Sequence, residues 1–205
     1  MIFCAFYTIG TIYETEAARL RSSLDKLGLD HDIVGVPDGG SWAANVHKTA
    51  AFTLAMQLKH DGEPVCYLDA DAVVWSRPEI LFALDADQTD LAFHRRRGVE
   101  LLNGTLWLAN TEASRAACQR YIDLCEANRH ERDEQRFLWQ AVEQLGSRWV
   151  NLPASYCWIS DIMAEDISGE DPVIEHMQCS REASGSSLLP NRRARLAYLT
   201  SMGRI

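Results

Sequence analysis

Apolar residues follow two different periods along this chain. Short apolar runs over 2–7, His31–Val36 and 64–68 are rich in β-branched and aromatic residues and predict buried strands. The stretches 13–27 and 46–60 carry apolar residues three or four positions apart and predict helices. The alternation continues with predicted helices over 76–84, 114–128 and 133–145, and with predicted strands over 91–94, 104–109, 149–152 and 173–176. This order predicts an α/β fold, a single Rossmann-like domain with a mostly parallel central sheet flanked by helices.

The C-terminal part of the chain has a different composition. Residues 160–171 are acidic and predict a loop, and residues 182–190 are rich in serine and glycine. The remaining residues carry four arginines. We therefore expect one domain over 1–205, of which about 182–205 is a flexible basic tail.

Composition narrows the possible functions. A chain of 205 residues is long enough for one domain with a sizeable core. Its net charge of −9 argues against a surface that binds nucleic acid or anionic membranes throughout. It has no apolar run long enough to span a bilayer, and no basic segment before the first strand that would indicate a signal peptide. Its six cysteines form no CxxC pair, so we expect reduced thiols in a cytoplasmic protein.

Two aspartates follow the third predicted strand. In extended backbone, residues i and i+2 point to the same side, so Asp69 and Asp71 place two carboxylates together at the end of a buried strand. Their repulsion and loss of hydration would be offset by a divalent cation, and hard oxygen ligands suit Mg²⁺ or Mn²⁺. The alternative is a solvated turn, for which aspartate is a common residue.

Other unusual polar residues also follow predicted strands. They lie in the segments 8–13, 37–45, 94–97 and 176–181. Ligands of open α/β sheets bind beyond the carboxyl ends of the strands, so these segments and the aspartate pair indicate one site.

Four segments, in this order, resemble those of a known family. They are Tyr67 to Asp71, the run from Leu102 to Asn110 with its Asn103-Gly104 pair, Asp133-Glu134-Gln135 at the start of a helix, and Ile174-Glu175-His176 at the end of a late strand. The chain is similar to nucleotide-diphospho-sugar glycosyltransferases of the GT-A type, especially the glycogenin-like and lipopolysaccharide-galactosyltransferase-like enzymes. It departs from them in two places: Asn103 directly precedes Gly104 without a small residue between them, and Arg181 stands where a glycine and a lysine usually follow the histidine.

The resemblance implies a metal-dependent transfer of sugar to a hydroxyl acceptor. It implies that Asp69, Asp71 and His176 bind Mn²⁺ or Mg²⁺, and that Asp133, Glu134 and Gln135 are the catalytic candidates. The implied donor is a nucleotide-diphospho-sugar, with a UDP-sugar favoured. The implied donor-binding residues are Thr8, Gly10, Thr11, Tyr13, Trp42, Asn45, Lys48, Asp69, Ala70, Asn103, Gly104 and Arg181.

Several of these residues also have ordinary structural explanations. Thr11 suits a helix cap, Asn103-Gly104 is a strong turn signal, and acidic residues are favoured at a helix start such as Asp133. Lys48 near a helix N-terminus is unfavourable to the helix dipole, which indicates an anionic partner or simply a solvated side chain.

The sequence leaves the acceptor and the enzyme class open. A hydroxyl on a sugar, a lipid-linked glycan or a modified base in DNA fits the resemblance. The cationic run from His94 to Arg97 is a solvated face, a set of salt-bridge partners, or a contact for a phosphate of the donor or the acceptor. A nucleotidyltransferase or a non-catalytic module that binds nucleotide-sugars would share much of this pattern. The segment Thr8 to Thr11 has neither the glycine run nor the cation expected of a nucleotidyltransferase.

Overall fold

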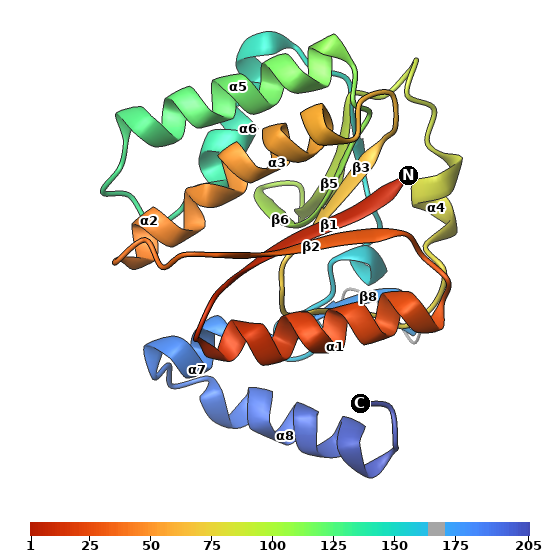
Figure 1. The fold of residues 1–205 in the computed structure, drawn as a ribbon, viewed down its shortest axis with the longest axis vertical. Helices are drawn as coiled ribbons and strands as arrows, with labels where there is room; N and C mark the ends of the chain where they lie inside the picture. Colours follow the sequence, from red (N-terminus) through yellow and green to blue (C-terminus); the bar gives the residue numbers. More distant parts are fainter. Residues whose placement is uncertain (164–170) are drawn as a thin grey trace.

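The computed structural model describes residues 1–163 and 171–205, apart from the side chain of Trp42. A six-stranded sheet in the order β2-β1-β3-β6-β5-β7 forms its centre (Figure 1). Its strands are β1 (Ile2–Thr8), β2 (His31–Val36), β3 (Val65–Leu68), β5 (Leu91–Arg96), β6 (Glu100–Leu108) and β7 (Trp149–Asn151). Three of the neighbouring pairs are parallel, so the predicted α/β fold with a mostly parallel sheet is confirmed.

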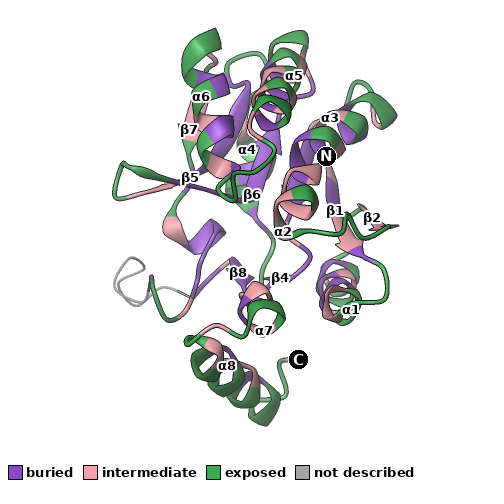
Figure 2. Cartoon of the chain, turned by 90° about the vertical axis from the view of Figure 1, so that its left-hand side faces the viewer, coloured by how far each residue is buried: buried purple, intermediate pink, exposed green. Residues whose placement is uncertain are grey.

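Helices cover both faces of this sheet. On one face lie α3 (Lys48–Lys59), α5 (Glu112–Ala127) and α6 (Gln135–Leu145), and on the other lie α1 (Ile12–Lys26) and α4 (Glu79–Ala83). Residues of β3 alternate between the two cores: Val65 and Tyr67 pack toward the first group, Cys66 and Leu68 toward the second. Burial on both faces explains why the strands are continuously apolar, and Figure 2 shows the central strands almost entirely buried.

Strand β6 runs antiparallel to both of its neighbours, β3 and β5. It begins at Glu100, four residues before the predicted start, and continues through the Asn103-Gly104 pair. That pair is therefore not a turn, and its residues lie beside the carboxyl end of β3, where Leu68 pairs with Thr105.

A second, two-stranded sheet joins distant parts of the chain. Strand β4 (Ala72–Val74) pairs antiparallel with β8 (Ile174–His176), with Ala72 opposite His176. This pairing brings the late histidine next to the segment that carries Asp69 and Asp71.

The helical regions differ most from the sequence prediction in two places. The predicted helix over 46–60 is divided into α2 (Trp42–Val46) and α3, with His47 between them. The region predicted as a flexible basic tail contains α7 (Ser180–Ser184) and α8 (Leu189–Ser201) instead. The reason is that Arg192 of α8 is buried in ion pairs rather than solvated, which composition alone did not reveal. Of the predicted acidic loop over 160–171, residues 164–170 lie outside the described residues.

The six cysteines are buried and form no disulfide. In the part of the chain that the structure describes, no helix has the length and apolar character needed to cross a bilayer.

Asn110 connects the end of β6 to the turn after α3. It has a φ of 59°, and its side-chain amide donates to the carbonyls of Gln57, His60 and Glu63 at 2.9, 2.7 and 2.8 Å. The residue is buried, so this amide holds the C-terminal end of α3 against the end of β6.

We predict that Asn110→Asp lowers the free energy of unfolding by on the order of 3 kcal/mol, because a carboxylate oxygen would face carbonyl oxygens in a buried position. Urea unfolding measures the loss. As a control, Asn128→Asp removes a single bond to the Leu124 carbonyl at a partly exposed position and should cost about 1 kcal/mol. Equal losses in the two variants would contradict this explanation.

Candidate functional site

Three predicted metal ligands converge at the end of β3. The backbone of Asp69 is fixed by its N–H, which donates to the Gly104 carbonyl at 2.9 Å. The carbonyl of Asp71 accepts from the N–H of Met177 at 3.0 Å, continuing the β4–β8 pairing past His176. As a result, ligand atoms of Asp69, Asp71 and His176 all lie within 4.8 Å of one another.

This cluster fits a divalent cation. Two oxygen ligands on opposite sides of Mg²⁺ are about 4.2 Å apart, so small side-chain rotations suffice to bring the three groups to one ion. The Nδ1 atom of His176 is buried and has no hydrogen-bond partner among the described residues, and it lies 3.8 Å from Oδ1 of Asp71. The other ring nitrogen is held by the hydroxyl of Thr105 at 3.1 Å, which orients Nδ1 toward the carboxylates.

The Asp69 and Asp71 carboxylates repel each other, and a cation between them would offset this repulsion. Burial and the neighbouring Asp71 raise the pKa of Asp69, whose Oδ1 accepts from the Tyr67 hydroxyl at 2.8 Å. Burial alone would raise the pKa of Asp71 as well, but His176 and the N–H of Cys179 lower it. Burial disfavours the His176 cation, yet Cys157 and the two aspartates raise its pKa. His176 and the two aspartates therefore favour one another's charged forms.

Gly104 provides the space for this cluster. A Cβ atom at this position would lie 2.8 Å from Cε1 of His176, 2.9 Å from Oδ2 of Asp69 and 3.0 Å from Nδ1 of His176. Any other residue would displace the ligands, which explains in physical terms why a glycine occurs in the middle of a buried strand.

The cluster lies in the wall of a cavity of about 630 Å³, a size typical of small-molecule sites. The cavity extends from the end of β1 to the start of α6, along the carboxyl edge of the parallel strands. Of the residues that the sequence indicated, it brings together Thr8, Thr11, Tyr13, Asn45, Asp69, Ala70, Asp71, Asn103, Gly104, Glu134, Gln135 and His176.

Asn103, Glu134 and Gln135 form one hydrogen-bonded group in this wall. The side-chain amide of Asn103 donates to Glu134 Oε1 at 3.3 Å, and its backbone N–H donates to Gln135 Oε1 at 3.0 Å. Burial raises the pKa of Glu134 to about 7, although the bond from Asn103 opposes this shift. Glu134 is therefore a carboxyl group that changes charge near neutral pH beside the cluster.

Neither a protein-family model nor a curated protein sequence matches the chain. Solved structures do match in fold. The apo form of the glycosyltransferase GlyE from Streptococcus pneumoniae TIGR4 aligns at a TM-score of 0.63 and 17% identity, over 85% of this chain and 53% of that one. A glycosyltransferase involved in glycosylation of the major capsid of PBCV-1 aligns at 0.62 and 15%, over 89% and 96%. The galactosyltransferase LgtC, in complex with donor and acceptor sugar analogs, aligns at 0.55 and 13%, over 86% of each chain.

The chain has a GT-A glycosyltransferase fold. The resemblance inferred from its motifs is thus confirmed for the fold. The chain spans about half the length of GlyE and nearly the full length of the capsid-modifying enzyme.

Four of the predicted site residues lie outside the lining of the GT-A cavity as the described residues form it. Asp133 is exposed and its neighbour Glu134 takes the place in the wall. The ammonium group of Lys48 donates to the Pro37 carbonyl and, at 2.8 Å, to Asn45, so it supports the loop after β2. Arg181 forms a two-point ion pair with Asp161 at 2.7 and 2.9 Å.

Gly10 is the fourth of these residues. Its φ is 73°, and its N–H donates to Glu14, so it forms the turn before α1. The hydroxyl of Thr11 caps that helix by accepting from the Tyr13 N–H. Thr11 also lines the cavity, where its contact with the donor stays a prediction. For Trp42, the side chain lies outside the described residues.

Sequence reasoning missed several residues of the cavity. Thr49, Arg132, Cys157 and Gln178 line it, and the resemblance assigns no role to any of them. Gln178 has a φ of 54°, a left-handed conformation that is uncommon for a residue other than glycine. Its place two residues after His176 is the sequence signal that could have indicated it.

The cationic run from His94 to Arg97 lines a separate hollow at the β5–β6 hairpin. The Arg95 guanidinium stacks 3.8 Å from the centre of the Trp139 ring, and Arg96 pairs with Glu100 and with the Ile162 carbonyl. These two arginines have partners within the protein, and the pair of Arg96 with Glu100 fits the interpretation of the run as a set of salt-bridge partners.

We predict that Gly104→Ala weakens Mn²⁺ binding at least tenfold, because its Cβ would displace His176 and Asp69, and that it costs about 1–3 kcal/mol of stability through overpacking. Isothermal titration and urea unfolding measure the two effects. Gly98→Ala is the control: its φ of 71° makes alanine strained, but no atom lies within 4 Å, so stability should fall and Mn²⁺ affinity should not. Unchanged affinity in Gly104→Ala would contradict the geometry.

We predict that Glu134→Gln removes a pH dependence of stability. A carboxyl whose pKa is about 7 when folded and about 4.5 when unfolded stabilises the folded protein fully below pH 4.5, and this contribution is lost as the pH rises to about 7. The loss is on the order of 3 kcal/mol. Urea unfolding at pH 5 and pH 8 should show a smaller difference for Glu134→Gln than for the wild type. Asp133→Asn should keep most of the wild-type difference, because burial is the largest cause of the Glu134 shift and the Asp133 charge is a minor one.

Proposed function

We propose that the protein is a metal-dependent glycosyltransferase that moves a sugar from a UDP-sugar to a hydroxyl acceptor. The observation that carries this proposal is the convergence of Asp69, Asp71 and His176 in the wall of a ligand-sized cavity of a GT-A fold. Within the described residues, these carboxylates have no lysine or arginine partner and lie next to a buried histidine nitrogen without a partner, an arrangement that is poorly explained as a structural feature.

The three ligands would hold Mn²⁺ or Mg²⁺ through their carboxylate oxygens and His176 Nδ1. When bound, a divalent cation neutralises the diphosphate leaving group as a Lewis acid. The Tyr67 hydroxyl and the Cys179 N–H hold one oxygen of Asp69 and one of Asp71, which leaves the second oxygen of each carboxylate for the cation.

The remaining cavity residues divide into two groups. Thr8, Thr11, Tyr13 and Asn45 lie at the end of β1 and in the loop after β2, and we assign the nucleotide to them. Across the cluster, Asn103, Gly104, Glu134 and Gln135 would contact the donor sugar. Glu134 replaces Asp133 as the acidic candidate near the anomeric carbon, because Glu134 lines the cavity and Asp133 does not.

A hydroxyl on a sugar is the acceptor that we favour. The LgtC structure was solved with donor and acceptor sugar analogs, and its fold covers most of this chain. A nucleic-acid acceptor would need several cations near the cavity, whereas Arg132 is the one arginine or lysine among the described residues that line it. Arg95 and Arg96 of the cationic run have protein partners. The turn at Thr8 to Thr11 carries no cation for a triphosphate, which disfavours a nucleotidyltransferase.

Thermal unfolding with UDP, GDP, CMP and dTDP, each with and without Mn²⁺, tests the proposal. We expect stabilisation by UDP only when Mn²⁺ is present, of roughly 2.7 kcal/mol at a hundred times the dissociation constant. Asp71→Asn should abolish this shift, and the exposed Asp133→Asn should retain it. No shift with any nucleotide and metal would contradict the proposed function, and a metal-independent shift that survives Asp71→Asn would contradict the metal site.

A second experiment measures enzymatic activity as the release of UDP from a UDP-sugar. With Mn²⁺ and a panel of UDP-sugars, we expect UDP to form faster when sugar acceptors are added and not when DNA is added. Normal UDP binding with no release of UDP from any UDP-sugar, whichever acceptor is added, would favour the non-catalytic binding module.

A further inference from the structure

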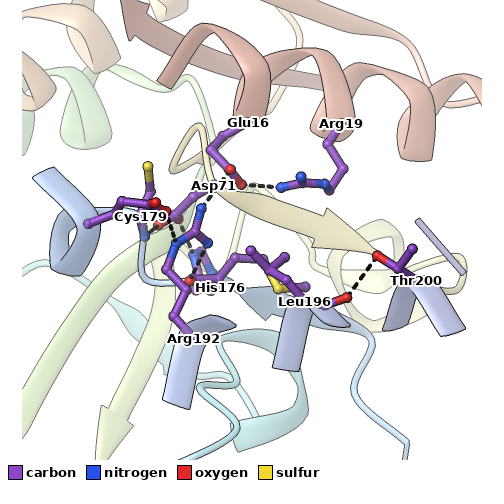
Figure 3. A network of polar contacts seen from close by, with 10 residues as sticks. Glu16, Arg19, Asp71, His176, Cys179, Arg192, Leu196 and Thr200 are labelled. Carbon is purple, nitrogen blue, oxygen red and sulfur yellow. Dashed lines mark hydrogen bonds and ion pairs between the residues drawn. The ribbon is translucent and has the colours of Figure 1, made fainter. Parts of the chain in front are cut away.

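Helix α8 contributes a buried arginine that lies beside Asp71, one of the proposed metal ligands. Arg192 is 3% exposed, and its guanidinium contacts three separate segments (Figure 3). Nη2 donates to Glu16 of α1 at 2.7 Å, Nη1 donates to the Met177 carbonyl at 2.8 Å, and Nε donates to Glu182 at 3.3 Å. A planar guanidinium can bridge acceptors in this way, and a lysine cannot.

The segment that Arg192 holds is the one that orients Asp71. The N–H of Cys179 donates to Asp71 Oδ2 at 2.6 Å, and the N–H of Met177 donates to the Asp71 carbonyl at 3.0 Å. Between them, Gln178 keeps its left-handed backbone, a conformation that persists only where the surroundings impose it. The bond from Arg192 to the Met177 carbonyl is one of those constraints.

We infer that Arg192 is a positioning residue for the metal site: by fixing the turn from Met177 to Cys179, it holds Asp71 and His176 in the geometry that binds the cation. This inference rests on the proposed function, since it assumes that the Asp69, Asp71 and His176 cluster binds a metal. Residues that orient metal ligands from behind typically change affinity by 10–100-fold when they are removed.

The direction in which the metal affinity changes distinguishes a positioning role of Arg192 from an effect of its charge. A positive charge next to a cation site repels the cation, so loss of the Arg192 charge alone would strengthen metal binding. Loss of the bridge would weaken it. Arg192→Met removes both the charge and the bridge, and Arg192→Lys removes only the bridge.

Arg195 offers a matched control on the same helix. It lies one turn after Arg192 and binds Glu175 through two bonds of 2.7 and 2.9 Å. Glu175 is fully buried, and Trp75 donates to it at 2.8 Å. Arg195→Met therefore leaves a buried carboxylate with one partner and should destabilise the fold, but Arg195 makes no bond to the turn from Met177 to Cys179.

The experiment is titration of Mn²⁺ into the wild type, Arg192→Met, Arg192→Lys and Arg195→Met, with and without UDP, by calorimetry and by the electron paramagnetic resonance signal of free Mn²⁺. Metal-free melting temperatures are measured in parallel. We expect both Arg192 variants to bind Mn²⁺ 10–100-fold more weakly. Arg195→Met should melt at a lower temperature than the wild type and bind Mn²⁺ within about twofold of it, since the ligand geometry is retained.

Three results would overturn the inference. They are wild-type affinity in Arg192→Met, wild-type affinity in Arg192→Lys, or an equal loss of affinity in Arg195→Met, which would assign the effect to general stability. The failure of the proposed function is distinct: in that case the wild type itself binds no Mn²⁺, with or without UDP.

Discussion

The fixed position of Asp71 is the constraint on which the rest of the site depends. Its backbone carbonyl and one carboxylate oxygen both accept hydrogen bonds from the turn between Met177 and Cys179, more than a hundred residues later. These bonds extend the pairing of β4 with β8, and that pairing brings His176 to the end of β3. The metal cluster and the closure of the fold by its C-terminal segment are therefore one arrangement: disturbing the late turn would alter the ligands, and moving the ligands would open the small sheet.

The antiparallel direction of β6 is the second requirement. A parallel strand would present only its last residues at the carboxyl edge of the sheet, but β6 enters at this edge and runs away from it. Asn103 and Gly104 consequently line the cavity from within a buried strand, and Thr105 reaches His176. Glycine is needed there because the ring of His176 occupies the space of its missing side chain.

Local patterns were sufficient for the elements and for the aspartate pair, because strand period and apolar content are properties of neighbouring residues. They predicted nearly every strand and the metal candidates. They could not distinguish Glu134 from the adjacent Asp133, since burial is decided by how α6 meets β6. They also could not reveal that Arg181 pairs with Asp161, which lies twenty residues away. The predicted flexible tail differs from the structure for the same reason: Arg192 looks solvated in sequence and is buried against Glu16, 176 residues earlier.

The distribution of arginines explains why two acids are left for a metal. Among the described buried acids, Glu16, Asp90 and Glu175 each pair with an arginine, and Glu134 instead keeps a proton up to about pH 7. In the described part of the chain, neither Asp69 nor Asp71 forms an ion pair with a lysine or arginine, although the Arg192 guanidinium lies beside Asp71 (Figure 3). Arg192 directs its donors to Glu16, Glu182 and a backbone carbonyl, so it fixes the turn without forming a hydrogen bond to Asp71. An arginine aimed at Asp71 would fill the position of the cation. Because the Arg192 guanidinium instead faces Glu16, Glu182 and the Met177 carbonyl, it shapes that position and leaves the carboxylates open to the cavity.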